Sequence, residues 1–132
     1  MANGADSRRL SVDVYAAAAK RFPTEFLPAQ YYFESAYDYG TPEVAREAAT
    51  NLLKQTPTQN LPDVWRRLMQ LADKTEGDKF VRVVWSWIEA SQRTYGADFN
   101  NAALFGDILD RHGMSAEGQA LWKAASESPL LP

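Results

Sequence analysis

The 132-residue sequence predicts an all-α fold of about seven helices in antiparallel αα-hairpins. In the stretch 80–95, apolar residues recur at spacings of three and four, which indicates a helix. Strict alternation fails at Val83, Val84 and Trp85, which disfavours a strand. Connectors rich in proline, glycine or polar residues separate this stretch from other periodic segments. Because a short connector makes consecutive helices spatial neighbours, we expect hairpins, either stacked as helical repeats or closed into a compact bundle.

The stretch 80–95 is expected to form a central buried helix. Val81, Val83 and Trp85 widen its apolar stripe beyond the usual single face. A helix that is apolar around most of its circumference needs neighbours on several sides. Trp85 lies to one side of the stripe that contains Ile88, so either another helix covers the ring or the ring is an exposed anchor for a partner. Burial within the chain is the favoured interpretation.

The N-terminal segments carry clear start and stop signals. In the first helix, Leu10, Val14, Ala17, Ala18 and Phe22 share a face that is expected to point inward. Pro23 ends that helix, since proline cannot continue the hydrogen-bond ladder. The first expected helix begins at Ser7 or Ser11 and ends at Phe22. The other expected helices cover residues 29–39, 42–54, 61–73, 80–95, 100–112 and 115–127.

Glycines and polar caps mark the turns between the later helices. Gly40 and Gly113 stand at the C′ position, where glycine commonly adopts the left-handed conformation. Thr41, followed by proline and then an acid, is expected to cap the third helix. Asn100 or Asn101 is expected to cap the sixth helix, and Ser115 the seventh. In the seventh helix the inward face is expected to contain Ala116, Ala120, Leu121 and Ala124.

The composition of the chain excludes several classes of protein. Net charge is −3 and the chain has no cysteine, so a broadly basic nucleic-acid surface, a disulfide framework and a thiolate metal site are not expected. No apolar run reaches the roughly 20 residues that span a bilayer. We therefore expect a soluble intracellular protein, with organellar import left open by Arg8 and Arg9. Residues 7–127 are expected to form a single helical domain between the tails 1–6 and 128–132.

A faint repeat appears in the order of the hairpins. Leu27-Pro28 and Leu61-Pro62 lie 34 residues apart and each begins a hairpin. The unit 99–132 has Gly113 at its turn, the apolar pair Leu121-Trp122 in its second helix and a proline near its end. This layout resembles pentatricopeptide and tetratricopeptide repeats over roughly residues 27–132.

The resemblance implies a fold of stacked hairpins. Pentatricopeptide repeats read RNA bases with polar residues near the start of each first helix. The matching positions here are Tyr31, Leu68 and Leu104, and leucine cannot hydrogen-bond to a base edge. The resemblance therefore favours a protein-binding or scaffolding use of the fold.

Residue patterns for catalysis are weak. His112 is the single histidine, and Asp107 and Asp110 beside it are too few ligands for a metal site, so we interpret it as a cap at the end of a helix. The carboxylates around Glu34 and Glu43 are interpreted as a solvated face and not as an acid–base pair. No phosphate-binding glycine motif is present. We therefore expect no enzyme activity, no metal and no small-molecule cofactor.

The function expected from this reasoning is a non-catalytic protein-binding or scaffold module, acting either alone or as a subunit of a larger complex. Its partner would be another protein or a second copy of the chain, and the candidate contact residues are Tyr31, Tyr32, Trp85, Arg66 and Arg67. The alternative is an RNA-associated helical repeat protein or ribonucleoprotein subunit. Its candidate contacts are Arg8, Arg9, Lys20 and Arg21.

Overall fold

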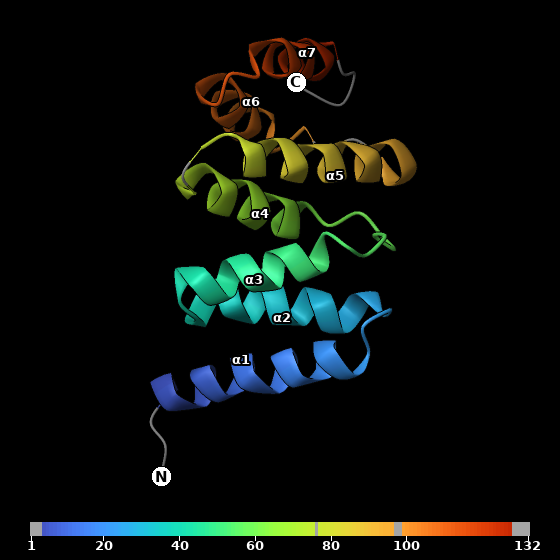
Figure 1. The fold of residues 1–132 in the computed structure, drawn as a ribbon. Helices are drawn as coiled ribbons and strands as arrows, with labels where there is room; N and C mark the ends of the chain where they lie inside the picture. Colours follow the sequence, from blue (N-terminus) through green and yellow to red (C-terminus); the bar gives the residue numbers. More distant parts are fainter. Residues whose placement is uncertain (1–3, 76, 97–98, 128–132) are drawn as a thin grey trace. The chain divides into compact units, whose positions relative to one another are not determined.

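The computed structural model describes residues 4–75, 77–96 and 99–127, with side chains from residue 10 onward. The described ranges contain seven α-helices and no strand, which confirms the all-α prediction (Figure 1). The bounds are α1 (Gly4–Arg21), α2 (Phe26–Tyr39), α3 (Pro42–Leu52), α4 (Pro62–Lys74), α5 (Lys79–Tyr95), α6 (Ala102–Arg111) and α7 (Ser115–Ser126).

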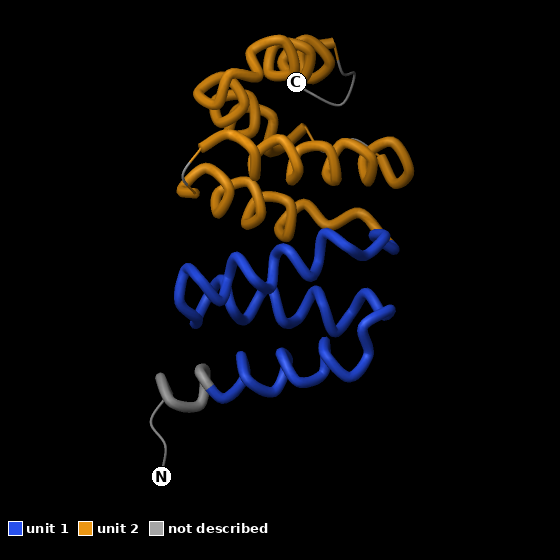
Figure 2. Tube along the Cα trace, viewed as in Figure 1, with its two compact units in different colours: residues 1–58 blue, residues 59–132 orange. Residues whose placement is uncertain are grey.

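The chain divides into two compact units (Figure 2). Unit 1 is residues 1–58 and contains α1, α2 and α3, and unit 2 is residues 59–132 and contains the other four helices. Within unit 1, α2 packs against both α1 and α3. Within unit 2, α4 packs against α5 and α6, and α7 packs against α6.

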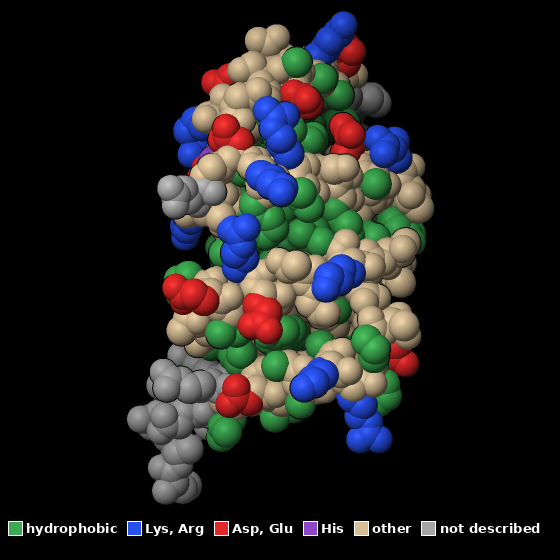
Figure 3. All heavy atoms as spheres, in the orientation of Figure 1, with side chains coloured by type: hydrophobic (Ala, Val, Ile, Leu, Met, Phe, Trp, Pro, Cys, Tyr) green, Lys and Arg blue, Asp and Glu red, His purple; other side chains and the backbone are tan. Residues whose placement is uncertain are grey.

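Helix α1 buries the opposite face from the one that its larger side chains predict. Val12 and Ala19 are buried, whereas Leu10 is 58% exposed and Val14 63% exposed. The helix therefore has two apolar faces, and the contact with α2 uses the one with smaller side chains. Periodicity could not decide between them, so the predicted inward face, including the half-exposed Phe22, is wrong. On the face of the molecule in Figure 3, hydrophobic side chains reach the surface over α1.

The turn from α2 to α3 was predicted in part. The backbone N–H of Val44 donates to Thr41 Oγ1 at 3.2 Å, so the predicted cap is confirmed. Gly40 has φ −95°, so its predicted left-handed conformation is wrong. Glycine is required there because a Cβ atom would lie 2.8 Å from the carbonyl oxygen of Ala36. The chain thus leaves α2 in an extended conformation and enters α3 directly.

Helix α5 buries a wide face in the core of unit 2, but it is not buried around most of its circumference as predicted. Val81, Val84 and Ile88 are fully buried, whereas Val83 and Ala90 are exposed. The rings of Trp85 and Phe105 meet edge to face, with centroids 6.0 Å apart, and this contact joins α5 to α6. The other large side chains fully buried in this unit are Val64, Trp65, Leu68, Met69, Ile108 and Leu109.

Helices α6 and α7 pack closely against each other. Gly113 has φ 76° between them, which confirms its predicted left-handed conformation. A Cβ atom on Gly118 would lie 3.0 Å from the carbonyl oxygen of Gly106. Ser115 does not cap α7, since Met114 holds that position and the Ser115 hydroxyl donates to Asp110 Oδ1 at 2.6 Å. The predicted cap is therefore wrong, because the carboxylate competes for the hydroxyl.

The predicted cap of α6 needs a similar correction. Asn101 holds the N-cap position, but its side chain makes no capping hydrogen bond. Its Nδ2 instead donates to the carbonyl oxygen of Pro62, at 3.4 Å. This amide therefore links the start of α6 to the start of α4.

Candidate functional site

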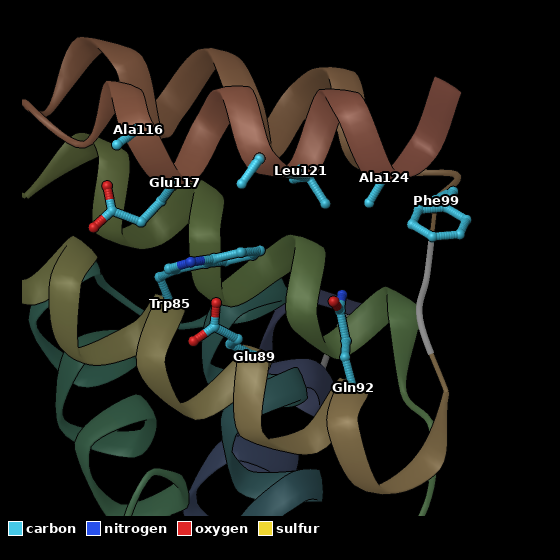
Figure 4. A pocket seen from close by; sticks show the side chains of 9 residues that line it. Trp85, Glu89, Gln92, Phe99, Ala116, Glu117, Leu121 and Ala124 are labelled. Atoms are coloured by element: carbon cyan, nitrogen blue, oxygen red, sulfur yellow. The ribbon is translucent and has the colours of Figure 1, made fainter. Parts of the chain in front are cut away.

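A pocket of about 450 Å³ lies between α5 and α7 in unit 2 (Figure 4). Helix α7 turns a row of alanines toward it at spacings of four: Ala116, Ala120 and Ala124. Their side chains end at Cβ, so they cannot fill the space over α5, and all three stay exposed. We call this pocket the α5–α7 groove. Its lining residues are Trp85, Glu89, Gln92, Phe99, Ala116, Glu117, Ala120, Leu121 and Ala124.

The wall formed by α5 has an aromatic floor and a polar edge. Trp85, Glu89 and Gln92 follow each other at spacings of four and three, so they share one helix face. Figure 4 shows the indole of Trp85 lying across the groove, beneath α7. Phe99 closes the end of the groove beside Ala124, and Leu121 points into it from α7. The groove is therefore a mainly apolar slot between two helices.

Two residues that line the groove carry hydrogen-bond donors without an acceptor. The indole Nε1 of Trp85 and the amide Nε2 of Gln92 are both buried from solvent and lack a partner. Trp85 as a whole is only 5% exposed. A buried donor without an acceptor costs about 1–3 kcal/mol. Both nitrogens lie below the surface of the groove and do not face its open space.

The charges in the groove are of one sign. Glu89 lies on the α5 wall and Glu117 on the α7 wall, and no Lys or Arg lines the groove. Glu89 pairs with Arg93 on the solvent side, at 3.3 Å, and both side chains are well exposed. Glu117 has no ion-pair partner among the described residues. The negative charge at the rim of the groove is therefore mainly that of Glu117, because Arg93 partly offsets the charge of Glu89.

The five candidate protein-binding residues do not form one surface. Tyr31 is exposed in unit 1, and its ring lies 5.6 Å from that of Tyr15. Tyr32 and Trp85 are buried, so neither ring is an exposed anchor in this structure. The reason is coverage by neighbouring helices, which for Trp85 includes the edge contact with α6. Trp85 is the one candidate that contributes to the groove.

The two candidate arginines of α4 lie outside the groove. Both side chains are half-buried. Arg66 pairs with Asp63 at 3.3 Å, one turn earlier in the same helix. An i,i+3 pair of this kind on a helix surface contributes a few tenths of a kcal/mol. The ion pair gives Arg66 a local structural role.

The candidate RNA contacts lie in α1. Lys20 and Arg21 are exposed, and the guanidinium of Arg21 lies 5.6 Å above the ring of Phe22. The side chains of Arg8 and Arg9 lie outside the described residues. Basic and acidic side chains are interspersed on the face of the molecule in Figure 3.

A second polar cluster in unit 2 surrounds His112, at the end of α6. Its Nε2 lies 2.9 Å from Asp73 Oδ1 and its Nδ1 lies 2.9 Å from Asp78 Oδ1. Arg111 Nη1 donates to Asp73 Oδ1 at 2.6 Å. His112 holds the C-cap position of α6, as expected, but its two carboxylate partners come from α4 and from the turn before α5. The cluster thus ties α6 to the α4–α5 hairpin.

The cluster shifts the pKa values of its members. The hydrogen bond to Asp73 raises the pKa of His112 above its ordinary 6.5, against an opposing effect of desolvation. Desolvation pushes the pKa of Asp73 upward, but hydrogen bonds from His112 and Arg111 together outweigh it and lower that pKa. An imidazole with carboxylates at both ring nitrogens donates to both when it is protonated. Within the described residues, no group of three or more His, Asp or Glu side chains has an arrangement suited to a metal ion.

Several groove residues escaped the sequence reasoning. Ala116, Ala120 and Ala124 were expected to pack inward, and this prediction is wrong, because all three are exposed and α7 instead buries Gly118, Leu121 and Ala125. Glu89, Gln92 and Glu117 had no signal beyond their positions on two helix faces. The available clue was a row of alanines opposite a large aromatic residue. Such a row leaves space, but only the structure shows that α5 lies across it.

Comparison of the sequence with protein-family models, with curated proteins and with solved structures finds no match. The resemblance to helical repeats therefore stays a prediction. In the described part of the chain, no helix combines the length and the apolar character that crossing a membrane requires.

Proposed function

We propose that this chain is a non-catalytic protein-binding module in which the α5–α7 groove receives an apolar segment of another protein. The observation that carries the proposal is a mainly apolar groove whose α7 wall consists largely of exposed alanines. A docked segment would cover this apolar lining. That change favours binding, since apolar burial contributes about 25 cal/mol per Å².

Trp85 supports the proposal by its position. Large aromatic residues at the centre of a desolvated pocket are typical binding hot spots. Here the indole is already held by the edge contact with Phe105 and is 5% exposed, so little side-chain entropy is lost when a partner covers the groove above it. A pre-ordered ring of this kind favours affinity.

A substitution that fills the groove tests the proposal. Replacing Ala120 by Phe puts a ring into the slot, whereas Ala90→Phe adds the same ring at an exposed position of α5 outside the groove lining. Pull-down from native extract should recover a partner with the wild-type chain and with Ala90→Phe, and lose it with Ala120→Phe. Circular dichroism confirms that both variants keep their helicity. Equal recovery with Ala120→Phe would contradict docking in the groove.

Self-association is tested by the same variants. If the partner is a second copy of the chain, light scattering after size exclusion should show a dimer that Ala120→Phe converts to a monomer. Ala90→Phe should leave the dimer intact. A dimer that persists in Ala120→Phe would place the self-contact elsewhere.

The second candidate function, RNA binding, is favoured by one observation in unit 1. The exposed ring of Tyr31 lies beside Tyr15, and α1 also carries exposed Lys20 and Arg21. Aromatic rings near basic side chains can hold single-stranded RNA by stacking and phosphate contact. A gel shift with single-stranded RNA that weakens as salt rises would support this function. No shift at low salt would end it.

A further inference from the structure

We propose that the occupant of the α5–α7 groove is an amphipathic helix that carries Lys or Arg at the edge of its apolar face. This inference rests on the proposed function and adds the chemistry of the partner. Three properties of the groove support it: the kind of walls it has, the sign of its charges and its apolar lining.

The walls of the groove favour a helix over an extended segment. Both walls are α-helices, whose backbone groups are already hydrogen-bonded within each helix. An extended segment would bring unpaired amide and carbonyl groups against an apolar floor that offers no backbone partner. A helix satisfies its own backbone and presents only side chains. The α7 lining from Ala116 to Ala124 spans about 12 Å, which is roughly two helical turns.

The charges select the sign of the partner. Glu89 and Glu117 lie on opposite walls, and Figure 4 shows both carboxylates at the end of the groove away from Phe99. A Lys or Arg at the edge of an inserted helix would lie between two carboxylates, of which Glu89 already pairs with Arg93 and Glu117 does not. An acidic residue at the same place would be repelled mainly by Glu117, with no basic residue in the lining to compensate.

The apolar lining sets the face of the partner. Trp85, Phe99 and Leu121 line the groove together with the alanines of α7. We therefore expect the docked face of the partner helix to be apolar and basic at its edge.

Two synthetic peptides test the inference directly. Both are labelled 14-residue amphipathic helices with the same Leu/Ala face. One carries Lys at the edge positions and the other carries Glu at the same positions. Fluorescence anisotropy should show the Lys peptide binding at least about tenfold more tightly, with a gap that narrows as salt rises. Ala120→Phe should abolish the binding of the Lys peptide.

Charge reversal in the groove gives the sharper test. The double variant Glu89→Lys/Glu117→Lys should invert the preference, so that the Glu peptide binds more tightly. The control Glu43→Lys/Glu47→Lys makes the same change of charge on exposed carboxylates of α3, in unit 1, and should leave the preference unchanged. All four positions are exposed, so both double variants should keep the wild-type circular dichroism spectrum.

The outcomes of these experiments distinguish a wrong partner chemistry from a wrong proposed function. Equal binding of the two peptides, or preference for the Glu peptide by the wild-type chain, overturns the basic partner. Failure of both peptides to bind overturns the helical occupant. In each of these cases, loss of the captured protein with Ala120→Phe still supports docking in the groove. A captured protein that resists Ala120→Phe overturns the proposed function itself.

Discussion

Units 1 and 2 are built from helices of similar length, but they differ in the links between segments distant in sequence. In unit 1, Gln55 Nε2 donates to the carbonyl oxygen of Pro23 at 2.6 Å, and α1 is held on α2 mainly by small apolar side chains. In unit 2, His112 contacts carboxylates 34 and 39 residues away, and Asn101 contacts Pro62.

The difference bears on what specifies the position of each helix. Apolar contacts are not directional, so a helix with two apolar faces can be covered on either one. A hydrogen bond between charged groups has a defined geometry and fixes one arrangement. We therefore expect the polar cluster to specify the position of α6, and the burial of Val12 and Ala19 to specify α1 less strictly.

The largest expected effect is in the core of unit 2. Phe105→Ala removes a fully buried ring and its edge contact with Trp85, and should lower the free energy of unfolding by about 3–5 kcal/mol. The matched change in unit 1, Phe22→Ala, removes a ring that is nearly half exposed and should cost less than about 1 kcal/mol. Urea denaturation measures both values. Similar losses in the two variants would contradict the assigned cores.

The polar cluster predicts a pH dependence. The pKa of His112 is raised in the folded chain, so its contribution to stability is complete below the ordinary value of 6.5 and is lost as pH rises through the folded pKa. The pKa of Asp73 is lowered, so its contribution is complete above the ordinary 3.8 and is lost as pH falls through the folded value. Stability from this cluster should therefore be greatest between about pH 4 and 6.5.

A histidine variant isolates that dependence. His112→Gln cannot become charged, and at pH 6 it should be less stable than the wild-type chain by about 1–3 kcal/mol. As pH rises to 9, the difference in Tm between the two chains should shrink. Because His112 is the single histidine, no other imidazole contributes to the comparison. Parallel Tm curves from pH 5 to 9 would show that the cluster does not stabilise unit 2 through the imidazolium.

Two hydroxyl residues at helix starts predict a smaller contrast between the units. Thr41→Ala removes the cap of α3 in unit 1 and should cost about 1 kcal/mol. Ser115→Ala removes an exposed hydrogen bond to Asp110 in unit 2, not a cap, and should change stability by less than about 0.5 kcal/mol. Thermal melts of the two variants give the order. Equal losses would mean that Ser115 caps α7 in solution.

Much of this fold could be predicted from local signals. Pro62, Thr41 and Gly113 set helix ends through backbone geometry, which the sequence determines within a few residues. The burial of Val81 and Trp85 in α5 followed from an apolar surface too wide for a single neighbour, although Val83 on the same helix is exposed. Seven helices and their order therefore needed no knowledge of tertiary contacts.

The candidate site could not be predicted in the same way. The groove exists because the alanines of α7 lie opposite Trp85 of α5. The sequence does not indicate which helix faces which. The partners of His112 lie more than 30 residues away, at spacings that no local rule selects. The buried face of α1 depended on which of two apolar faces α2 covers. In all three cases the missing information was the pairing between helices.

The smallest expected effect tests the two faces of α1. Leu10→Ser and Val14→Ser change exposed side chains, so each should alter the free energy of unfolding by no more than about 0.5 kcal/mol. Val12→Ser places a hydroxyl on the buried face and should cost about 1–3 kcal/mol. Urea denaturation of the three variants gives the order directly. If Leu10→Ser and Val14→Ser lower the free energy of unfolding more than Val12→Ser does, α1 is rotated in solution so that its larger side chains face inward. Polar contacts would then fix the position of α6 in unit 2, whereas apolar contacts in unit 1 would leave even the rotation of α1 about its axis less strictly determined.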